Sequence, residues 1–176
     1  MKGEIMTYKT RRVAGGLLAG LAGGLIATWT MGQFQNAWSK AAEKLQDEPK
    51  PQNDSGEDAD DATMKAADKV SRNLLHRPLT QEQKKKASPF VSYAFGGTMG
   101  ALYGVAAELL PAVTRGFGTG FGAAVWAAAD EIAVPAFGLA EGPTKAPISS
   151  HLLGLASHLV YGSAAEGVRR LALLAI

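Results

Sequence analysis

The sequence predicts an all-α, polytopic membrane protein in which four transmembrane helices form two tandem helix hairpins. Three observations support this fold class: four long stretches with almost no charge, an excess of glycine, and an internal repeat. The chain has 176 residues, no cysteine and a formal net charge of +2, so a disulfide scaffold and a thiolate site are excluded and nothing favours nucleic acid as a partner. The mean hydropathy is near zero because one highly charged segment offsets the apolar remainder.

Four stretches are long enough to cross the hydrocarbon core of a bilayer, which takes about 20 mostly apolar residues. These stretches are Val13–Ser39, Ala87–Thr114, Gly116–Ala140 and Ala146–Ala165. The first and the fourth contain no Asp, Glu, Lys or Arg, the second contains only Glu108, and the third contains only Asp130 and Glu131. We therefore predict four membrane helices and the lipid bilayer as a partner.

A charged segment separates the first span from the second and is expected to form an extramembrane loop with one or two short amphipathic helices. Its acidic run, residues 47–61, is expected to be disordered or solvated, and Asp60 or Asp61 can cap the helix that follows. Thr80 and Gln83 form a capping-box pattern before a short basic helix that leads into the second span. Pro89 then suits a first helical turn.

The predicted segments follow from these stretches. They are the N-terminal basic segment with the first span in 1–38, the polar loop in 39–87, and the remaining three spans in 88–114, 115–140 and 141–176.

An internal repeat relates the second span to the fourth. Ser92–Glu108 and Ser150–Glu166 align at a constant offset of 58 and share the pattern Tyr-Gly-x-Ala-Ala-Glu. More weakly, Gly16–Ala27 aligns with Gly116–Ala127. Two copies of a two-span unit share one orientation, so the copies would be related by an axis along the membrane normal. Chance similarity between segments rich in Gly and Ala is the alternative.

Glycines recur at intervals of four in three of the predicted spans. Such spacing places a smooth stripe on one helix face, where backbones approach closely. The stripes comprise Gly16, Gly20, Gly24, Gly96, Gly100, Gly104, Gly116 and Gly120. We expect at least two stripes to pack within the chain. The others favour a homo-oligomer or a place in a larger membrane complex.

Two acidic residues are predicted near the ends of the second and fourth spans. Glu166 can pair with Arg169 or Arg170 on its own helix, and Glu108 is expected near Arg115 at the same membrane face. Ion pairs that fix helix ends are the first interpretation of these residues. A paired acid site that binds a proton or a cation is the second.

A second polar group is predicted deeper in the membrane. Asp130 and Glu131 lie well inside the third span, and His151 and His158 lie on one side of the fourth. The group could be a buried hydrogen-bond network, a proton relay or a metal site. No closely spaced His and carboxylate motif supports a metal, so none is expected. Pro135 should kink the third span just beyond its acidic pair.

Several short motifs occur in a fixed order along the chain. They are Tyr-Gly-x-x-Ala-Glu-x-x-Pro at 103–111, Phe-Gly at 121–122 with Trp126, DEIAVPAFGL from Asp130, His-Leu-Val-Tyr-Gly from His158, and Glu166 with Arg169 and Arg170. Together these motifs resemble the YagU-like family of small bacterial inner-membrane proteins, over most of residues 15–170 apart from the charged loop. The resemblance implies a bacterial inner membrane and at most an association with acid tolerance, and it supplies no catalytic residues.

Four spans place both termini on one side, and the basic residues in short segments favour the cytoplasm for that side. Lys84, Lys85 and Lys86 flank the second span on the other side and conflict with this orientation. No enzyme signature is present, so we expect no catalytic activity and no cofactor. The leading hypothesis is an accessory or structural subunit that assembles through glycine faces. The alternative is a small channel or transporter that moves protons or a cation past the intramembrane acids and histidines.

Overall fold

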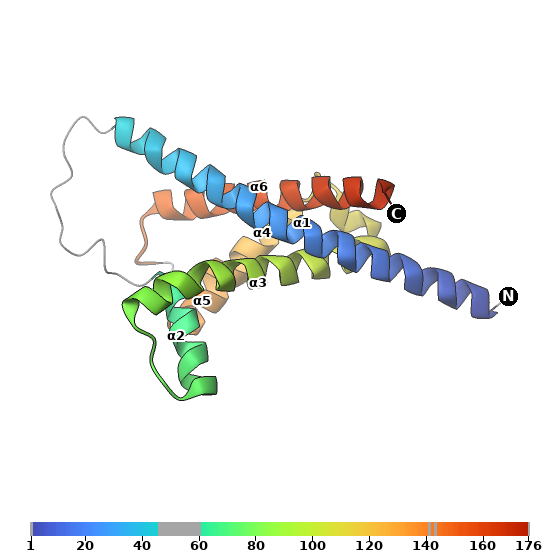
Figure 1. Cartoon of the computed structure of the whole chain (residues 1–176). Coiled ribbons are helices and arrows are strands. Elements are labelled where there is room, and N and C mark those ends of the chain that lie inside the picture. Colours follow the sequence, from blue (N-terminus) through green and yellow to red (C-terminus); the bar gives the residue numbers. More distant parts are fainter. Residues whose placement is uncertain (1, 46–60, 141, 143, 176) are drawn as a thin grey trace.

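The computed structural model describes residues 2–45, 61–140, 142 and 144–175 of the chain. All regular structure in these residues is helical, which confirms the all-α prediction. The elements are α1 (Lys2–Leu45), α2 (Ala62–Leu75), α3 (Gln81–Leu109), η1 (Pro111–Thr114), α4 (Thr119–Trp126), η2 (Ala127–Ala133), α5 (Val134–Ala136) and α6 (Ile148–Leu174). Both termini lie toward one end of the molecule, and α2 lies at the other (Figure 1). The greater part of the predicted acidic loop, residues 46–60, falls outside the described residues.

Helix α1 is much longer than the span predicted from the sequence. Its 44 residues extend for about 66 Å at 1.5 Å per residue, whereas the hydrocarbon core of a bilayer is about 30 Å thick. Within the described residues, Thr10–Lys44 is the one helix that is long and apolar enough to cross a membrane by length and composition. The number of membrane crossings therefore stays a prediction at this point.

The capping signals in the charged segment are confirmed. Asp61 caps α2, and its carboxylate accepts a 2.8 Å hydrogen bond from the Met64 N–H. Thr80 and Gln83 form the predicted capping box at the start of α3. Helix α3 then continues without a break, so the predicted basic helix and the second span are one helix. Pro89 consequently lies inside α3 and not in a first turn.

The third predicted span, 115–140, is not a single α-helix. It begins with a turn in which Gly116, Phe117 and Gly118 have φ angles of 69°, 55° and 79°. This left-handed backbone is easy for glycine but rare for a bulky residue such as Phe117. Because the turn occupies the start of the predicted span, α4 begins only at Thr119.

The same segment widens into a π-helix, η2, which carries both acidic residues of the third span. The Val134 N–H donates to the Ala129 carbonyl, five residues earlier. Pro135 follows directly and has no N–H to donate, so it cannot bond to the carbonyl four residues earlier in an α-helix. The proline thus explains the local widening just before it. Short π-helical segments are frequent at functional sites.

Glycine contacts join α1 to α3 within the chain. A Cβ atom on Gly100 would lie 2.4 Å from the Gly20 carbonyl oxygen, and one on Gly24 would lie 2.3 Å from the Gly96 carbonyl oxygen. Both values are shorter than any real Cβ contact, so only glycine fits at this helix crossing.

A second set of close contacts joins α4 to α6, at residues other than those predicted. Gly118 and Gly122 lie against Gly162 and the His158 carbonyl of α6. Gly120 has no atom within 4 Å of an added Cβ, and Gly116 belongs to the left-handed turn. The glycines that contact α6 are therefore Gly118 and Gly122, two positions later than the predicted Gly116 and Gly120. The turn at 116–118 determines which face of α4 meets α6.

Side-chain sizes are distributed in the opposite way to those of a water-soluble core. Small and polar residues fill the buried positions, among them Ala19, Ala27, Ala165, Ser157, Glu166 and Arg169. Large apolar side chains are exposed on the outer faces, among them Leu18, Ile26, Trp29, Phe90, Leu102 and Ile132. The described helices therefore present a broad apolar outer surface around a tight, partly polar interior.

Candidate functional site

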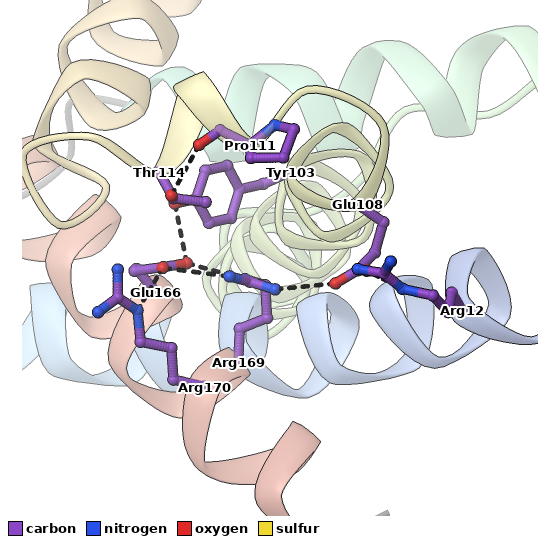
Figure 2. Close-up of polar contacts among 8 residues, drawn as sticks. All are labelled: Arg12, Tyr103, Glu108, Pro111, Thr114, Glu166, Arg169 and Arg170. Atoms are coloured by element: carbon purple, nitrogen blue, oxygen red, sulfur yellow. Dashed lines mark hydrogen bonds and ion pairs between the residues drawn. The ribbon is translucent and has the colours of Figure 1, made fainter. Parts of the chain in front are cut away.

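Glu166 is the centre of a buried ion-pair network in the half of the molecule that contains the termini (Figure 2). Its side chain has no exposed surface. Arg169 Nε donates to Oε2 at 2.8 Å, and Arg170 Nε donates to Oε1 at 2.6 Å. The Tyr103 hydroxyl of α3 donates to Oε2 at 2.9 Å. Two cations and one hydroxyl thus compensate the burial of this carboxylate, which would otherwise be costly.

Glu108 extends this network to α1. Its Oε2 accepts a 2.9 Å hydrogen bond from Arg12 Nη2, and its Oε1 accepts a 3.2 Å hydrogen bond from Arg169 Nη1 (Figure 2). Arg169 therefore bridges Glu108 and Glu166, the two equivalent acids of the sequence repeat. The partner expected for Glu108, Arg115, is exposed and makes no ion pair with any residue that the structure describes.

Asp130 and Glu131 each approach a different histidine of α6. Glu131 Oε1 lies 2.7 Å from His151 Nδ1, whereas Asp130 Oδ2 lies 3.6 Å from His158 Nδ1. His158 Nδ1 also lies 3.0 Å from the Gly154 carbonyl oxygen. Both groups facing this nitrogen are acceptors, so we assign a proton to it. The structure thus divides the predicted cluster into two acid–imidazole pairs, and no group of three or more potential metal ligands occurs among the described residues.

A cavity of about 600 Å³ reaches only one of these pairs. Asp130 and His158 line it, whereas Glu131 and His151 do not. Its walls come from α1, α2, α3, the α4–η2–α5 segment and α6, and include Thr28, Met31, Ser92, Phe95, Val125 and Tyr161. Its outer part lies beside the first turns of α2, where Asp61 and Thr63 line it.

The cavity exists because two of the long segments do not pack on each other. Helix α1 packs along α3 and α6, and α4 packs along α6, but α3 and α4 have no comparable contact. Helix α2 lies across the end of this gap. The Thr63 hydroxyl is hydrogen-bonded to the Ser88 hydroxyl of α3, and Lys69 Nζ donates to the Phe137 carbonyl oxygen at 3.1 Å. Helix α2 is thereby attached to both walls of the cavity.

Three aromatic rings lie between the cavity and the Glu166 network. The Tyr103 and Phe121 ring centroids are 4.5 Å apart, and those of Phe121 and Tyr161 are 6.5 Å apart. Tyr161 lines the cavity and donates its hydroxyl to the Gly96 carbonyl oxygen at 2.6 Å, whereas Tyr103 binds Glu166. The aromatic layer therefore closes the inner end of the cavity.

The α1–α3 and α4–α6 pairs make matching contacts. Gly16 lies against Gly104 in the first pair, and Gly118 lies against Gly162 in the second. The match continues along the helices. In the first pair Thr28 lies beside Gly96, and in the second pair Asp130 lies beside Gly154. Asp130 thus occupies the place in the second pair that a neutral hydroxyl, Thr28, occupies in the first.

Five residues of these sites carry roles that the sequence did not reveal. Arg12 was interpreted only as an orientation signal, Asp61 only as a helix cap, and Thr28 was not singled out. Tyr103 and Tyr161 were noted as members of the repeated pattern. Their position in the repeated Tyr-Gly-x-Ala-Ala-Glu pattern was a signal for a polar role, because each lies five residues before a buried or partly buried Glu.

Fold and site together define, over the described residues, an all-helical protein with glycine-packed helix pairs, a buried ion-pair network and a cavity lined by an Asp–His pair. The chain belongs to the family described as "Protein of unknown function (DUF1440)", whose model matches residues 70–167. This family agrees with the uncharacterised family that the motifs resemble. The match includes the Glu108, Asp130, His158 and Glu166 positions. No curated protein and no solved structure matches the chain.

Proposed function

We propose that the chain crosses a membrane four times, through α1, α3, the α4–η2–α5 segment and α6. The apolar outer surface supports this arrangement, because lipid solvates large apolar side chains while small residues permit close helix contacts. Helices α3 and α6 contain 29 and 27 residues, which is about 43 and 40 Å of helix. The segment from Thr119 to Ala136 is about 27 Å long at the same rise, close to the thickness of a hydrocarbon core.

The hydroxyl groups on these helices are compatible with lipid. Thr28 donates to the Gly24 carbonyl oxygen at 2.8 Å, and Thr98 donates to the Ala94 carbonyl oxygen at 2.7 Å. A hydroxyl bonded to its own helix does not need water. Such bonds allow a membrane helix to contain Ser and Thr, which lower the mean hydropathy of that helix.

Cysteine labelling tests the topology, since the chain has no cysteine of its own. Lys85→Cys lies near the start of α3, and Arg115→Cys lies in the connection between η1 and α4; both positions are exposed. A membrane-impermeant maleimide should label one of the two in sealed vesicles and the other only after the vesicles are opened. Labelling of both positions from the same side would contradict the arrangement. We expect Arg115 and both termini on the cytoplasmic side of a bacterial inner membrane.

We further propose that the protein moves protons or a cation through the site at Asp130 and His158. The observation that carries this proposal is the cavity, which gives the α2 side access to this one acid–imidazole pair. Ionisable groups at membrane depth need a partner or water, and they mark ion and proton pathways when they line a cavity. The aromatic layer closes the path toward the termini, so transport requires that this layer open.

Reconstitution of the full chain in liposomes tests this function. A pH-sensitive dye inside the vesicles should report proton entry driven by a potassium gradient with valinomycin. Asp130→Asn should reduce the rate by about tenfold or more, because an amide cannot carry the proton. Glu82→Gln is the matched control, since Glu82 is an exposed carboxylate in a surface ion pair with Lys86. Wild-type liposomes that conduct no faster than empty ones would refute the proposal.

The accessory-subunit hypothesis stays a prediction. It depended on glycine faces that are free to bind a partner, but Gly20, Gly24, Gly96 and Gly100 are engaged between α1 and α3. Gentle detergent extraction tests it directly. A stoichiometric partner or a homo-oligomer would support this role, and a monomer at all concentrations would count against it.

A further inference from the structure

The charged side chains that line the cavity are mainly acidic. Besides the Tyr161 hydroxyl, its ionisable groups among the described residues are Asp61, Asp130 and His158, and neither Lys nor Arg lines it. Asp61 lines the part beside α2 and Asp130 lines the part beside α6, so two carboxylates act on the same cavity. A cavity with walls of low dielectric concentrates such a field and attracts cations.

The inner carboxylate lacks a close partner. The side chain of Asp130 is 43% exposed, and the nearest basic atom in the described part of the chain, His158 Nδ1, lies 3.6 Å from it. Glu131, by contrast, has His151 at 2.7 Å. An ionised carboxylate at membrane depth requires a counter-charge, and among the described residues the charged groups nearest Asp130 are the His158 imidazole and the adjacent Glu131.

The cavity does not suit a bare metal cation. Small hard cations take six or more oxygen ligands at short distance, whereas most of these walls are apolar, including Met31, Val91, Phe95, Val125 and Phe137. A volume of about 600 Å³ falls in the usual range for small organic ligands, about 300 to 1,000 Å³. Aromatic rings in the wall also favour a positive charge on the ligand.

We infer that this cavity binds an organic monocation with an apolar body, whose ammonium group pairs with the Asp130 carboxylate. The inference rests on the proposed cation function and names its substrate class. A protonated amine that binds to the neutral acid displaces the carboxyl proton to solution, and its release allows the proton to return. Amine and proton therefore compete for one carboxylate, which couples their movements.

The charged groups that face Asp130 set the sign of the pH dependence. They are His158 from α6 and Glu131 from the same segment with its partner His151; Asp61, the N-cap of α2, lines the same cavity, and the lining residues of α1 and α3 are uncharged. A protonated His158 would repel the amine, and a protonated Asp130 would not attract it. Both effects make the cation bind more weakly in acid.

Calorimetric titration of the full-length protein in phosphatidylcholine nanodiscs tests the inference, with empty nanodiscs as the reference. The probe is 1-naphthylmethylamine, which is protonated at neutral pH, and its neutral counterpart is 1-naphthalenemethanol. The amine should bind about tenfold or more tightly than the alcohol, and its affinity should fall as the pH is lowered from about 8 to about 5. Asp130→Asn should abolish both the preference for the amine over the alcohol and the dependence of amine affinity on pH. Asp130→Glu and Glu82→Gln should retain both properties.

Two results would overturn the inference. Equal binding of amine and alcohol would identify an apolar site, such as one for a lipid chain, and unchanged amine binding in Asp130→Asn would place the cation elsewhere. Proton flux without any amine separates this inference from the proposed function. Flux that depends on Asp130, together with no preference for the amine, would refute the organic cation and leave proton movement standing. Absence of the amine preference together with absence of Asp130-dependent flux would refute both the organic cation and the proton movement.

Discussion

The Tyr103 hydroxyl of α3 donates a 2.9 Å hydrogen bond to Glu166 of α6, across 63 positions of sequence. The bond joins the first residue of one copy of the repeated Tyr-Gly-x-Ala-Ala-Glu pattern to the last residue of the other copy. Arg169 strengthens the connection, because its guanidinium binds both Glu166 and Glu108. The α1–α3 and α4–α6 pairs are thus joined by polar contacts at Glu166 and Glu108, in addition to the packing of α1 along α6.

Glu166→Gln should be strongly destabilising, because among the described residues it removes the one carboxylate that Arg170 binds and one of the two that Arg169 binds. Breaking a buried ion pair on one side typically costs about 3 to 5 kcal/mol. Tyr103→Phe removes a single hydrogen bond and should cost about 1 kcal/mol. Thermal unfolding of the purified protein in detergent measures both. Equal effects of the two substitutions would contradict the central place of Glu166.

Gly100→Ala should destabilise the protein, because the new methyl group would lie 2.4 Å from the Gly20 carbonyl oxygen and force α1 away from α3. Overpacking of this kind costs about 1 to 3 kcal/mol. Gly120→Ala is the matched control, since an added Cβ there meets nothing within 4 Å. The unfolding temperature should fall in the first variant and stay constant or rise in the second. A fall in Gly120→Ala alone would instead support the stripe that the sequence suggested.

The connection between α2 and α3 should depend on pH. The Leu79 N–H donates to Asp68 Oδ1 at 2.7 Å, and this hydrogen bond, followed by that from Arg72, holds the pKa of Asp68 below its ordinary value of 3.8. A depressed pKa means that the stabilisation is complete above the ordinary value and is lost as the pH falls through the lower, folded value. Hydrogen exchange of the Leu79 amide should therefore show protection from about pH 7 down to about pH 4 and lose it below. Asp68→Asn should lack this step, and an identical pH profile in the variant would refute the assignment.

Glu131→Gln should leave proton flux within about twofold of wild type, in contrast to the loss expected for Asp130→Asn. The sequence treats the two adjacent acids alike, but only Asp130 lines the cavity. Flux in the same liposomes measures the difference. Equal loss in both variants would show that the His151 pair belongs to the pathway and that the cavity does not define it.

Local signals in the sequence predicted local structure well. The caps at Asp61 and at Thr80 with Gln83 are confirmed because each depends on side chains within three residues of the backbone they bind. The pairing of Glu166 with Arg169 and Arg170 also follows from helical spacing alone. The break in the third span was less visible, because the left-handed turn at Gly116 to Gly118 depends on one glycine approaching Gly162 of a different helix.

The sequence by itself determined the helical class, the small residues at the helix contacts and the acids and histidines of the interior, since composition and spacing carry these properties. Only the tertiary structure decided which of these residues meet. The register of α4 on α6 places Gly122, and not Gly120, at the glycine contact. Because α3 and α4 make few contacts, Asp130 lines a cavity, whereas Glu131 lies against His151. Such choices depend on how whole helices pack, and no spacing within one helix contains that information.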